Sequence, residues 1–336
     1  MTEAYRVLGS DDLAELHDHR RDFAYDVLVG LSEKPKQLSS RYFYDDEGSR
    51  LFQEIMESPE YYLTGAEREI LEGHAAEILR RSTGEPFDLV DLGAGDGAKT
   101  CVLLEHLLEA GADVRYVPID ISEGAMGSLA DSLLTRLPGL SMHGLVSEYV
   151  DGVHWLSAHA AQRPKLVLFL GSNIGNFNAG QARAFLRRLW SSLAEGDRVL
   201  VGFDLKKDID RLLGAYNDAR GVTARFNVNL LARINRELGA NFELEKFRHF
   251  SSYDVFSGAM ESYLVSLEEQ RVFVEAVGQE FHFEAWEPVH TEYSYKYLPS
   301  DIRSLAADTG FVIEEDFHDA KRDFVDSLWR VERAVR

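Results

Sequence analysis

The chain has 336 residues, of which 45% are hydrophobic and 28% charged, and its formal net charge is -21. This composition predicts a globular protein with a full-sized core and two domains, and the acidic excess argues against nucleic acid or an anionic membrane as a partner. The single cysteine, Cys101, excludes an internal disulfide, and no signal peptide or membrane-spanning apolar run is visible, so we expect a cytoplasmic protein, and a monomer.

The N-terminal part of the chain predicts two helices joined by an aromatic-rich stretch. Residues 11–31 carry apolar side chains at helical spacing, namely Leu13, Leu16, Phe23, Val27 and Leu31. Aromatic residues are frequent between residues 41 and 62. Thr64 and Glu67 match a capping box, so the second helix is expected to begin there, with Ile70, Leu71, Ala75, Ile78 and Leu79 on one face.

A glycine-rich loop follows the first predicted strand. Residues 88–92 form a short apolar run, Gly93, Gly95 and Gly97 come next, and the strand predicted at 116–119 is followed by Asp120. Glycines let the backbone turn tightly and approach a ligand closely, and a carboxylate after the second strand can accept hydrogen bonds from a ribose diol. The pattern therefore predicts a nucleoside-binding site.

The loop is compatible with more than one nucleoside ligand. Residues 93–98 match a relaxed dinucleotide fingerprint, and residues 93–100 match a phosphate loop except that Ala98 replaces a glycine whose backbone must wrap the phosphates. Asp91 and Asp96 add negative charge where a pyrophosphate would lie, and two carboxylates suit a cationic sulfonium better. S-adenosylmethionine is therefore favoured. A dinucleotide, a nucleoside triphosphate and a glycine turn without a ligand remain the alternatives.

The chain then alternates strands and helices, as a parallel sheet requires. Strands are predicted at residues 166–170 and 198–203, and an antiparallel pair at the edge of the sheet is predicted near 310–314 and 324–332. Residues 206–296 break the alternation and are expected to form a large insertion or a second domain. The predicted fold class is α/β, with a doubly wound sheet.

Three segments are expected to meet at the carboxyl ends of the strands, where ligands of open α/β sheets bind. The first is the Gly93 loop with Lys99. The second contains Glu148 and Tyr149, which could hydrogen-bond and stack on an adenine, and the third is the turn at 171–176, which ends at Asn176. The alternatives are a solvated loop for the second segment and a turn with capping side chains for the third.

Seven motifs follow one another along the chain: Arg41-Tyr-Phe-Tyr-Asp45, Pro59-Glu-Tyr-Tyr62, Leu89-Val-Asp-Leu-Gly93 with Lys99-Thr100, Phe169-Leu-Gly-Ser-Asn-Ile-Gly-Asn176, Ala215-Tyr-Asn-Asp-Ala219, Asn235-Arg-Glu-Leu238 and Thr291-Glu-Tyr-Ser-Tyr-Lys296. Together they resemble the bacterial L-histidine Nα-methyltransferases of ergothioneine biosynthesis.

The resemblance implies a role for particular residues. It implies that S-adenosylmethionine is held by Gly93, Lys99, Asp120, Glu148 and Tyr149. It places Tyr44 near the methyl-transfer centre, with Tyr61, Asn176 and Tyr216 around the amino and carboxylate groups of a small amino-acid substrate. Glu292 and Ser294 lie against the imidazole, for which a carboxylate and a hydroxyl are natural partners.

The alternation of strands and helices predicts the domain plan, and the resemblance implies the reaction. A class I methyltransferase domain of residues 66–205 and 297–336 would bind the methyl donor, and residues 1–65 and 206–296 would form the substrate-binding domain. The α-amine of L-histidine would be methylated three times to Nα,Nα,Nα-trimethylhistidine (hercynine), without a metal.

The chain departs from the family pattern at two places, one in the expected cofactor site and one in the expected substrate pocket. Glu148-Tyr149 stands where the family usually has Asp-Phe, and Ser262 stands where we expect a methionine packed on the imidazole. Since serine is smaller and polar, the substrate pocket is expected to be roomier. The alternative substrates are tryptophan, tyrosine or a histidine derivative.

Overall fold

The computed structural model describes residues 4–8, 19–82, 86–159 and 163–333, which form two compact units. The first unit contains the described parts of residues 1–16, 63–206 and 296–336, and the second those of 17–62 and 207–295. The chain therefore crosses between units four times, once between residues 8 and 19 and then at 62/63, 206/207 and 295/296. The sequence-based division places its three crossings at 65/66, 205/206 and 296/297.

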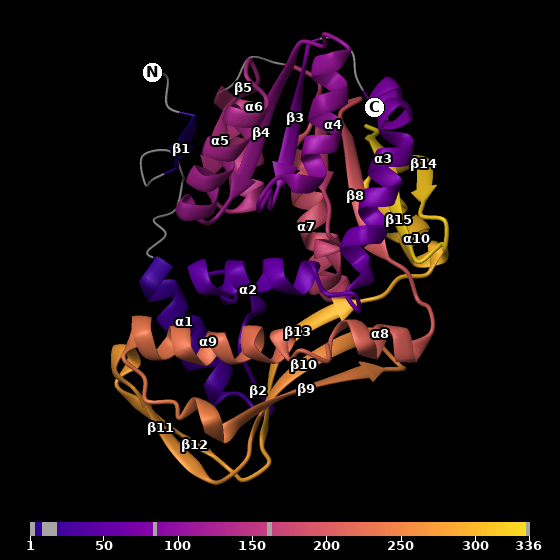
Figure 1. Ribbon diagram of the computed structural model, residues 1–336. Helices are drawn as coiled ribbons and strands as arrows, with labels where there is room; N and C mark the ends of the chain where they lie inside the picture. The colour runs from indigo at the N-terminus through magenta and orange to yellow at the C-terminus, as the bar shows by residue number, and fades with distance from the viewer. Residues whose placement is uncertain (1–3, 9–18, 83–85, 160–162, 334–336) are drawn as a thin grey trace. The chain divides into compact units, whose positions relative to one another are not determined.

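The first unit is built around a nine-stranded sheet of the described residues, with strand order β1-β6-β4-β3-β7-β8-β15-β14 and β5 paired to β4 (Figure 1). Its strands are β1 (Tyr5–Val7), β3 (Phe87–Leu92), β4 (Val114–Asp120), β5 (Ser141–Met142), β6 (Gly144–Val146), β7 (Lys165–Phe169), β8 (Arg198–Asp204), β14 (Phe311–His318) and β15 (Phe324–Val331). Its helices are α3 (Tyr62–Ser82), α4 (Ala98–Glu109), α5 (Glu123–Arg136), α6 (Tyr149–His159), η2 (Asn173–Asn176), α7 (Ala179–Ser192) and α10 (Pro299–Thr309).

Helices cover both faces of this sheet. Every residue of β3 and β7 is buried, which explains why their sequences do not alternate between apolar and polar residues and are mostly apolar, apart from Asp88, Asp91 and Lys165. Val90 and Leu92 belong to one core with buried side chains of α6, α7 and α10. Because side chains alternate along a strand, Asp91 points to the opposite face, where Thr100 of α4 donates a hydrogen bond to it.

The strand order reverses between β3 and β7. From β3 the chain proceeds to β4 and β6 on one side, whereas β7 and β8 lie on the other, and β3 is parallel to both β4 and β7. The predicted doubly wound α/β fold is confirmed. Such a reversal is the point at which open α/β sheets bind ligands, beyond the carboxyl ends of their strands.

The edges of the sheet confirm one prediction and correct another. β15 is antiparallel to both β8 and β14, as predicted for the C-terminal pair. At the other edge, Tyr5–Val7 pairs in parallel with β6, so these residues belong to the first unit and their assignment to the substrate-binding domain is wrong. A three-residue strand has too short a pattern to be recognised in the sequence.

The second unit packs helices on a four-stranded sheet of order β2-β13-β10-β9, with a separate β11–β12 hairpin (Figure 1). Its elements are α1 (His19–Ser32), β2 (Lys36–Gln37), η1 (Ser40–Tyr42), α2 (Asp46–Met56), α8 (Ile209–Ala215), α9 (Val222–Leu238), η3 (Leu244–Lys246), β9 (Phe247–Asp254), β10 (Ala259–Ser266), β11 (Gln270–Val274), η4 (Glu275–Val277), β12 (Gln279–Phe283) and β13 (Pro288–Tyr295). Buried residues of α1, α2, α9 and these strands form a core of their own.

Two predictions about helices need correction or restriction. The described part of the helix predicted at 11–31 is α1, and residues 11–18 lie outside the described residues. The capping box of Thr64 and Glu67 is wrong, because α3 already begins at Tyr62. The Glu67 side chain is instead buried and bonded to distant residues, as shown below.

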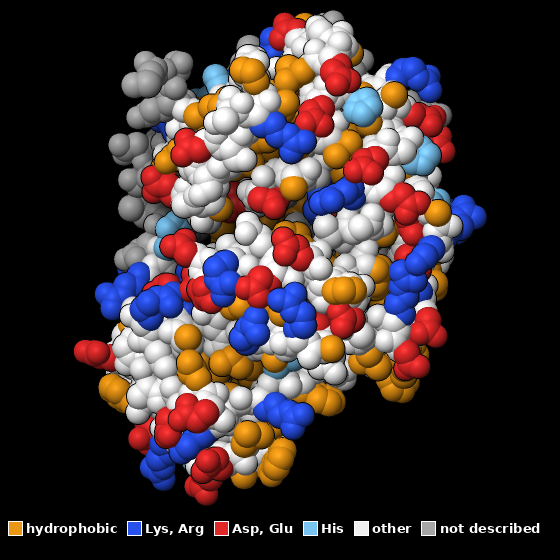
Figure 2. All heavy atoms as spheres, viewed as in Figure 1, with side chains coloured by type: hydrophobic (Ala, Val, Ile, Leu, Met, Phe, Trp, Pro, Cys, Tyr) orange, Lys and Arg blue, Asp and Glu red, His pale blue; other side chains and the backbone are white. Residues whose placement is uncertain are grey.

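Figure 2 shows acidic and basic side chains interspersed over the visible face. Within the described ranges, no helix combines the length and the apolar character that a bilayer span demands.

Candidate active site

The glycine loop after β3 is shaped by a close approach at Gly93. Its φ is +74°, and a Cβ there would lie 2.8 Å from the Tyr149 hydroxyl and 3.4 Å from Asn173 Nδ2. Only glycine meets both the backbone conformation and this lack of space. The loop, the start of α6 and the turn after β7 therefore converge at Gly93, as the sequence predicted.

The buried carboxyl group of Asp91, on β3, lies beside the glycine loop. Thr100 and Tyr116 both donate hydrogen bonds to Asp91 Oδ2, the latter at 2.9 Å. Burial raises the pKa of Asp91 to about 6, although these two hydrogen bonds and nearby Lys99 act in the opposite direction. Asp91 is therefore enclosed by protein groups, and it anchors the N-terminal turn of α4 to β3 and β4.

Asp120 ends β4 on the same edge of the sheet. Its Oδ1 accepts a hydrogen bond from the Ser122 backbone N–H at 3.0 Å. Burial raises the pKa of the Asp120 carboxyl, while backbone N–H groups, including those of Ser122 and Gly95, counteract that effect. Asp120 keeps partial exposure, so it is held in place and still accessible to a ligand.

Glu148 and Tyr149 differ in their surroundings. Glu148 is exposed, whereas Tyr149 starts α6 and is half-buried, with its ring in edge contact with Phe169 at 5.8 Å. Burial raises the pKa of the Tyr149 phenol well above its ordinary value, with the negative charges of Asp120 and Glu148 adding to the effect. The phenol is therefore a neutral hydrogen-bonding group at physiological pH.

Lys99 is held by a residue that the sequence interpretation assigned to a helix cap. Its Nζ donates to Glu67 Oε2 at 2.6 Å, and the Gly171 backbone N–H donates to Glu67 Oε1 at 2.7 Å. One buried carboxylate thus joins α4 to the turn after β7. Asn176 ends that turn, at the C-terminus of η2, with its side chain half-buried.

In the second unit, aromatic rings connect three of the predicted residues. Tyr44 is in edge contact with Phe52 at 5.4 Å, Phe52 with Tyr61 at 6.2 Å, and Tyr61 with Tyr216 at 6.4 Å. Such edge-to-face contacts fix the ring planes as well as the ring positions. Tyr44, Tyr61 and Tyr216 therefore form one continuous series of rings.

This series ends at β13. The Tyr216 hydroxyl and the Ser294 hydroxyl share a hydrogen bond of 2.6 Å, and both side chains are buried. Glu292 lies two residues before Ser294 on the same strand, hence on the same face. Its partner across the sheet is Ser262 of β10, so the departure from the family pattern lies directly beside Glu292.

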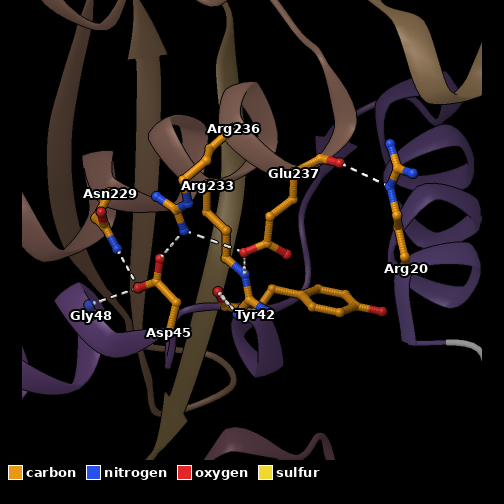
Figure 3. Close-up of polar contacts among 8 residues, drawn as sticks. All are labelled: Arg20, Tyr42, Asp45, Gly48, Asn229, Arg233, Arg236 and Glu237. Atoms are coloured by element: carbon orange, nitrogen blue, oxygen red, sulfur yellow. Dashed lines mark hydrogen bonds and ion pairs between the residues drawn. The ribbon is translucent and has the colours of Figure 1, made fainter. Parts of the chain in front are cut away.

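The segment that carries Tyr44 is fixed to one face of α9 (Figure 3). Asp45 accepts hydrogen bonds from the Gly48 backbone N–H at 2.7 Å, which caps α2, and from Asn229 at 2.8 Å, and it pairs with Arg236. Arg233 donates to the Tyr42 backbone carbonyl at 2.9 Å. Tyr44 is therefore held on both sides by contacts with α9.

The candidate residues divide between the two units. Gly93, Lys99, Asp120, Glu148, Tyr149 and Asn176 belong to the first, and Tyr44, Tyr61, Tyr216, Glu292 and Ser294 to the second. Sequence reasoning missed Glu67, since its partners lie 32 and 104 residues away. A charged residue on the apolar side of α3, near Ile70 and Leu71, is the only sequence signal that could have indicated it.

The chain is similar in sequence to known methyltransferases. The model of a family described as histidine-specific, SAM-dependent methyltransferase matches residues 23–331. The chain is 37% identical to a histidine N-alpha-methyltransferase of Mycolicibacterium smegmatis, covering 90% of this chain and 93% of that one. It is 35% identical to ergothioneine biosynthesis protein 1 of Neurospora crassa over 63% of this chain and 24% of that one. An L-tryptophan methyltransferase of Psilocybe serbica is 26% identical, covering 89% and 90%.

Proposed function

Because this chain belongs to the family of SAM-dependent, histidine-specific methyltransferases, we propose that it methylates the α-amino nitrogen of L-histidine. The product is Nα,Nα,Nα-trimethylhistidine (hercynine), formed by three successive transfers. The reaction stops there because the quaternary ammonium has no lone pair left. The proposed place of the reaction is the biosynthesis of ergothioneine.

The groups around the glycine loop fit S-adenosylmethionine chemically. Asp120 is held by backbone N–H groups yet partly exposed, as a partner for a ribose diol must be. Tyr149 and Glu148 offer a ring and a carboxylate for the adenine, and the Lys99 ammonium suits a carboxylate. When bound, S-adenosylmethionine supplies a methyl group on a positively charged sulfur. We assign its binding to Gly93, Lys99, Asp120, Glu148 and Tyr149.

The substrate residues have complementary functions. Glu292 and Ser294 provide an acceptor and a hydroxyl for the two nitrogens of an imidazole. Tyr61, Tyr216 and Asn176 provide hydroxyl and amide groups for the amino and carboxylate groups of the amino acid. Ser294 also bonds to Tyr216. Tyr216, assigned to the amino and carboxylate groups of the substrate, therefore fixes the orientation of Ser294, assigned to the imidazole.

Positioning accounts for most of the proposed catalysis, since the methyl group is already activated by the positive sulfur. The α-amine must present its lone pair, which requires that it lose any extra proton. We assign assistance in this deprotonation to Tyr44 or to a water molecule held near it, with the proton passing on to solvent water. The ring of Tyr44 is held in position by contacts with Phe52 and Phe226, at 5.4 Å and 5.7 Å.

The observation that carries the proposal is the connected series from Tyr44 through Tyr61 and Tyr216 to Ser294, with Glu292 beside it. The test is mass spectrometry of the purified protein incubated with S-adenosylmethionine and each common amino acid separately. We expect mono-, di- and trimethylated histidine. Methylation of tryptophan or tyrosine instead would mean that Ser262, beside Glu292, redirects the acceptor, and would overturn the assignment of histidine.

A substitution at Glu292 tests the imidazole contact. Glu292→Ala removes the carboxylate, so histidine binding should weaken sharply, while S-adenosylhomocysteine binding should stay almost unchanged in calorimetric titrations. Glu261→Ala is the matched control, because Glu261 lies one residue before Ser262 on β10 and faces the other side of the sheet. Equal losses for both ligands in Glu292→Ala would assign Glu292 a structural role.

A further inference from the structure

A second buried carboxyl group lies beside Glu67 in the first unit. Asp326 of β15 is fully buried, as is Glu67 of α3. Neither oxygen of the Asp326 side chain has a hydrogen-bond partner among the described residues. An unsatisfied buried carboxyl group is costly, and an ionised one more so, so the state of Asp326 needs an explanation.

Gly202 of β8 brings the two carboxyl groups together. It is the cross-strand partner of Asp326, and it has no side chain. A Cβ at Gly202 would overlap Glu67 Oε1 and lie 3.2 Å from Asp326 Oδ1. Both oxygens therefore lie at the space that a side chain at Gly202 would fill.

The charges at this place balance only if one carboxyl group is neutral. The charged groups that act on Asp326 are Glu67 of α3 and Lys99 of α4. Lys99 pairs with Glu67 at 2.6 Å, so an ionised Asp326 would leave one negative charge without a partner in the core. Burial, reinforced by the charge of Glu67, raises the pKa of Asp326 well above its ordinary value.

We propose that Asp326 is a protonated carboxylic acid that donates its hydrogen bond to Glu67 Oε1, and that Glu67, fixed in this way, positions Lys99 for the methyl donor. Glu67 then accepts three hydrogen bonds, from Lys99, from the Gly171 backbone and from Asp326. A carboxylate has room for four. The inference rests on the proposed function only in assigning Lys99 to the methyl donor.

The three hydrogen bonds give Glu67 a positioning role. Through Lys99 it sets the start of α4, and through the Gly171 N–H it sets the turn that carries Asn176. Both lie at the carboxyl ends of the central strands β3 and β7. The long Lys99 side chain has many conformations in solution, and the Glu67 contact selects one of them before the ligand arrives.

Infrared difference spectroscopy tests the protonation state directly. The C=O stretch of a protonated carboxylic acid should be present in the unmodified protein at pH 8 and absent in Asp326→Asn. The pH is chosen above the pKa of about 6 of Asp91, so that this other buried acid is ionised. A band that persists in Asp326→Asn and disappears in Glu67→Gln would place the proton on Glu67 and overturn the proposal.

Calorimetric titration with S-adenosylhomocysteine tests the positioning role. Asp326→Asn keeps an N–H donor toward Glu67, so the affinity should change by less than about twofold. Glu67→Gln deprives Lys99 of its charge partner, and the affinity should fall roughly tenfold or more. In a turnover assay the KM for S-adenosylmethionine should rise more than kcat falls, because the contact is made before the reaction as well as during it.

Asp88→Asn is the matched control for the loss of a buried ion pair. Asp88 is fully buried and bonded to Arg115 at 2.7 Å, at the opposite end of β3 from the glycine loop. This variant should lose stability without losing affinity for S-adenosylhomocysteine. An unchanged affinity in Glu67→Gln would overturn the positioning role. If Glu67→Gln does not fold, Asp326→Asn still tests the protonation state. An ionised Asp326 has no C=O stretch of a carboxylic acid, so the infrared band would then be unaffected by Asp326→Asn.

The infrared and calorimetric measurements do not depend on the acceptor. A protein that methylates another amino acid, or none, would still show the infrared band and the difference in affinity. Failure of the histidine assignment is therefore distinguishable from failure of this inference.

Discussion

At the scale of single residues, the candidate cofactor site is made of side chains that backbone groups hold in place. Asp120 is bonded to the N–H of Ser122, and Gly93 has no room for a side chain against Tyr149. These contacts are made between protein groups, which hold the side chains of the candidate site in place. Preorganisation of this kind lowers the entropic cost of binding.

Asp120→Ala should weaken the binding of S-adenosylhomocysteine by about 1–3 kcal/mol, the range for removing one partner of a buried polar group. Calorimetric titration gives the affinity. Asp131→Ala, which changes an exposed residue of the following helix α5, should leave it unaltered. Equal affinity in the unmodified protein and in Asp120→Ala would remove Asp120 from the ribose site.

At the scale of elements, α9 organises the second unit. Its residues 229, 233 and 236 are spaced so that they share one side of the helix, and they hold the segment from Tyr42 to Gly48. Buried side chains of the same helix, among them Phe226 and Leu230, enter the core of the unit. One helix thus connects the core to the segment of the proposed catalytic Tyr44.

Asp45→Ala should destabilise the second unit by about 1–2 kcal/mol, because it removes the N-cap of α2 together with the contacts to Asn229 and Arg236. Scanning calorimetry, which can separate the transitions of two units, is the measurement. Asp46→Ala alters the next residue, an exposed one in the first turn of α2, and should cost less. Similar losses in both variants would mean that the contacts to α9 contribute nothing.

At the scale of the whole molecule, stability is the sum of many opposing terms, and buried ionisable groups make it depend on pH. Asp91 is such a group in the first unit, where burial raises its pKa from 3.8 to about 6. Between these values the folded chain binds more protons than the unfolded chain. The contribution of Asp91 to stability is therefore complete below about pH 4 and is lost as the pH rises through about 6.

The loss amounts to about 3 kcal/mol, since each pKa unit corresponds to about 1.4 kcal/mol. Asp91→Asn cannot ionise, so its stability relative to the unmodified protein should improve by that order between pH 4 and pH 7. Urea unfolding monitored by tryptophan fluorescence is suitable, because Trp155, Trp190 and Trp329 all belong to the first unit. A difference that is independent of pH would contradict the raised pKa.

The sequence by itself determined the central strands, the glycine loop and the antiparallel C-terminal pair. These features are local: strands such as β3 and β7 are buried on both faces and are therefore mostly apolar, and the turn at Gly93 needs a residue that tolerates a positive φ. The order of the motifs likewise determined the family, which the comparisons bear out.

Only the tertiary structure decided which residues meet. Glu67 reads as a helix cap in the sequence, yet it binds Lys99 and Gly171. Tyr216 and Ser294 bond across 78 residues. Strand register pairs Gly202 with Asp326, and the missing side chain of Gly202 leaves room for Glu67. Local patterns record propensity and burial, whereas such contacts depend on the packing of elements that are far apart in the chain. Short strands such as β1 form only because a neighbour supplies their hydrogen bonds.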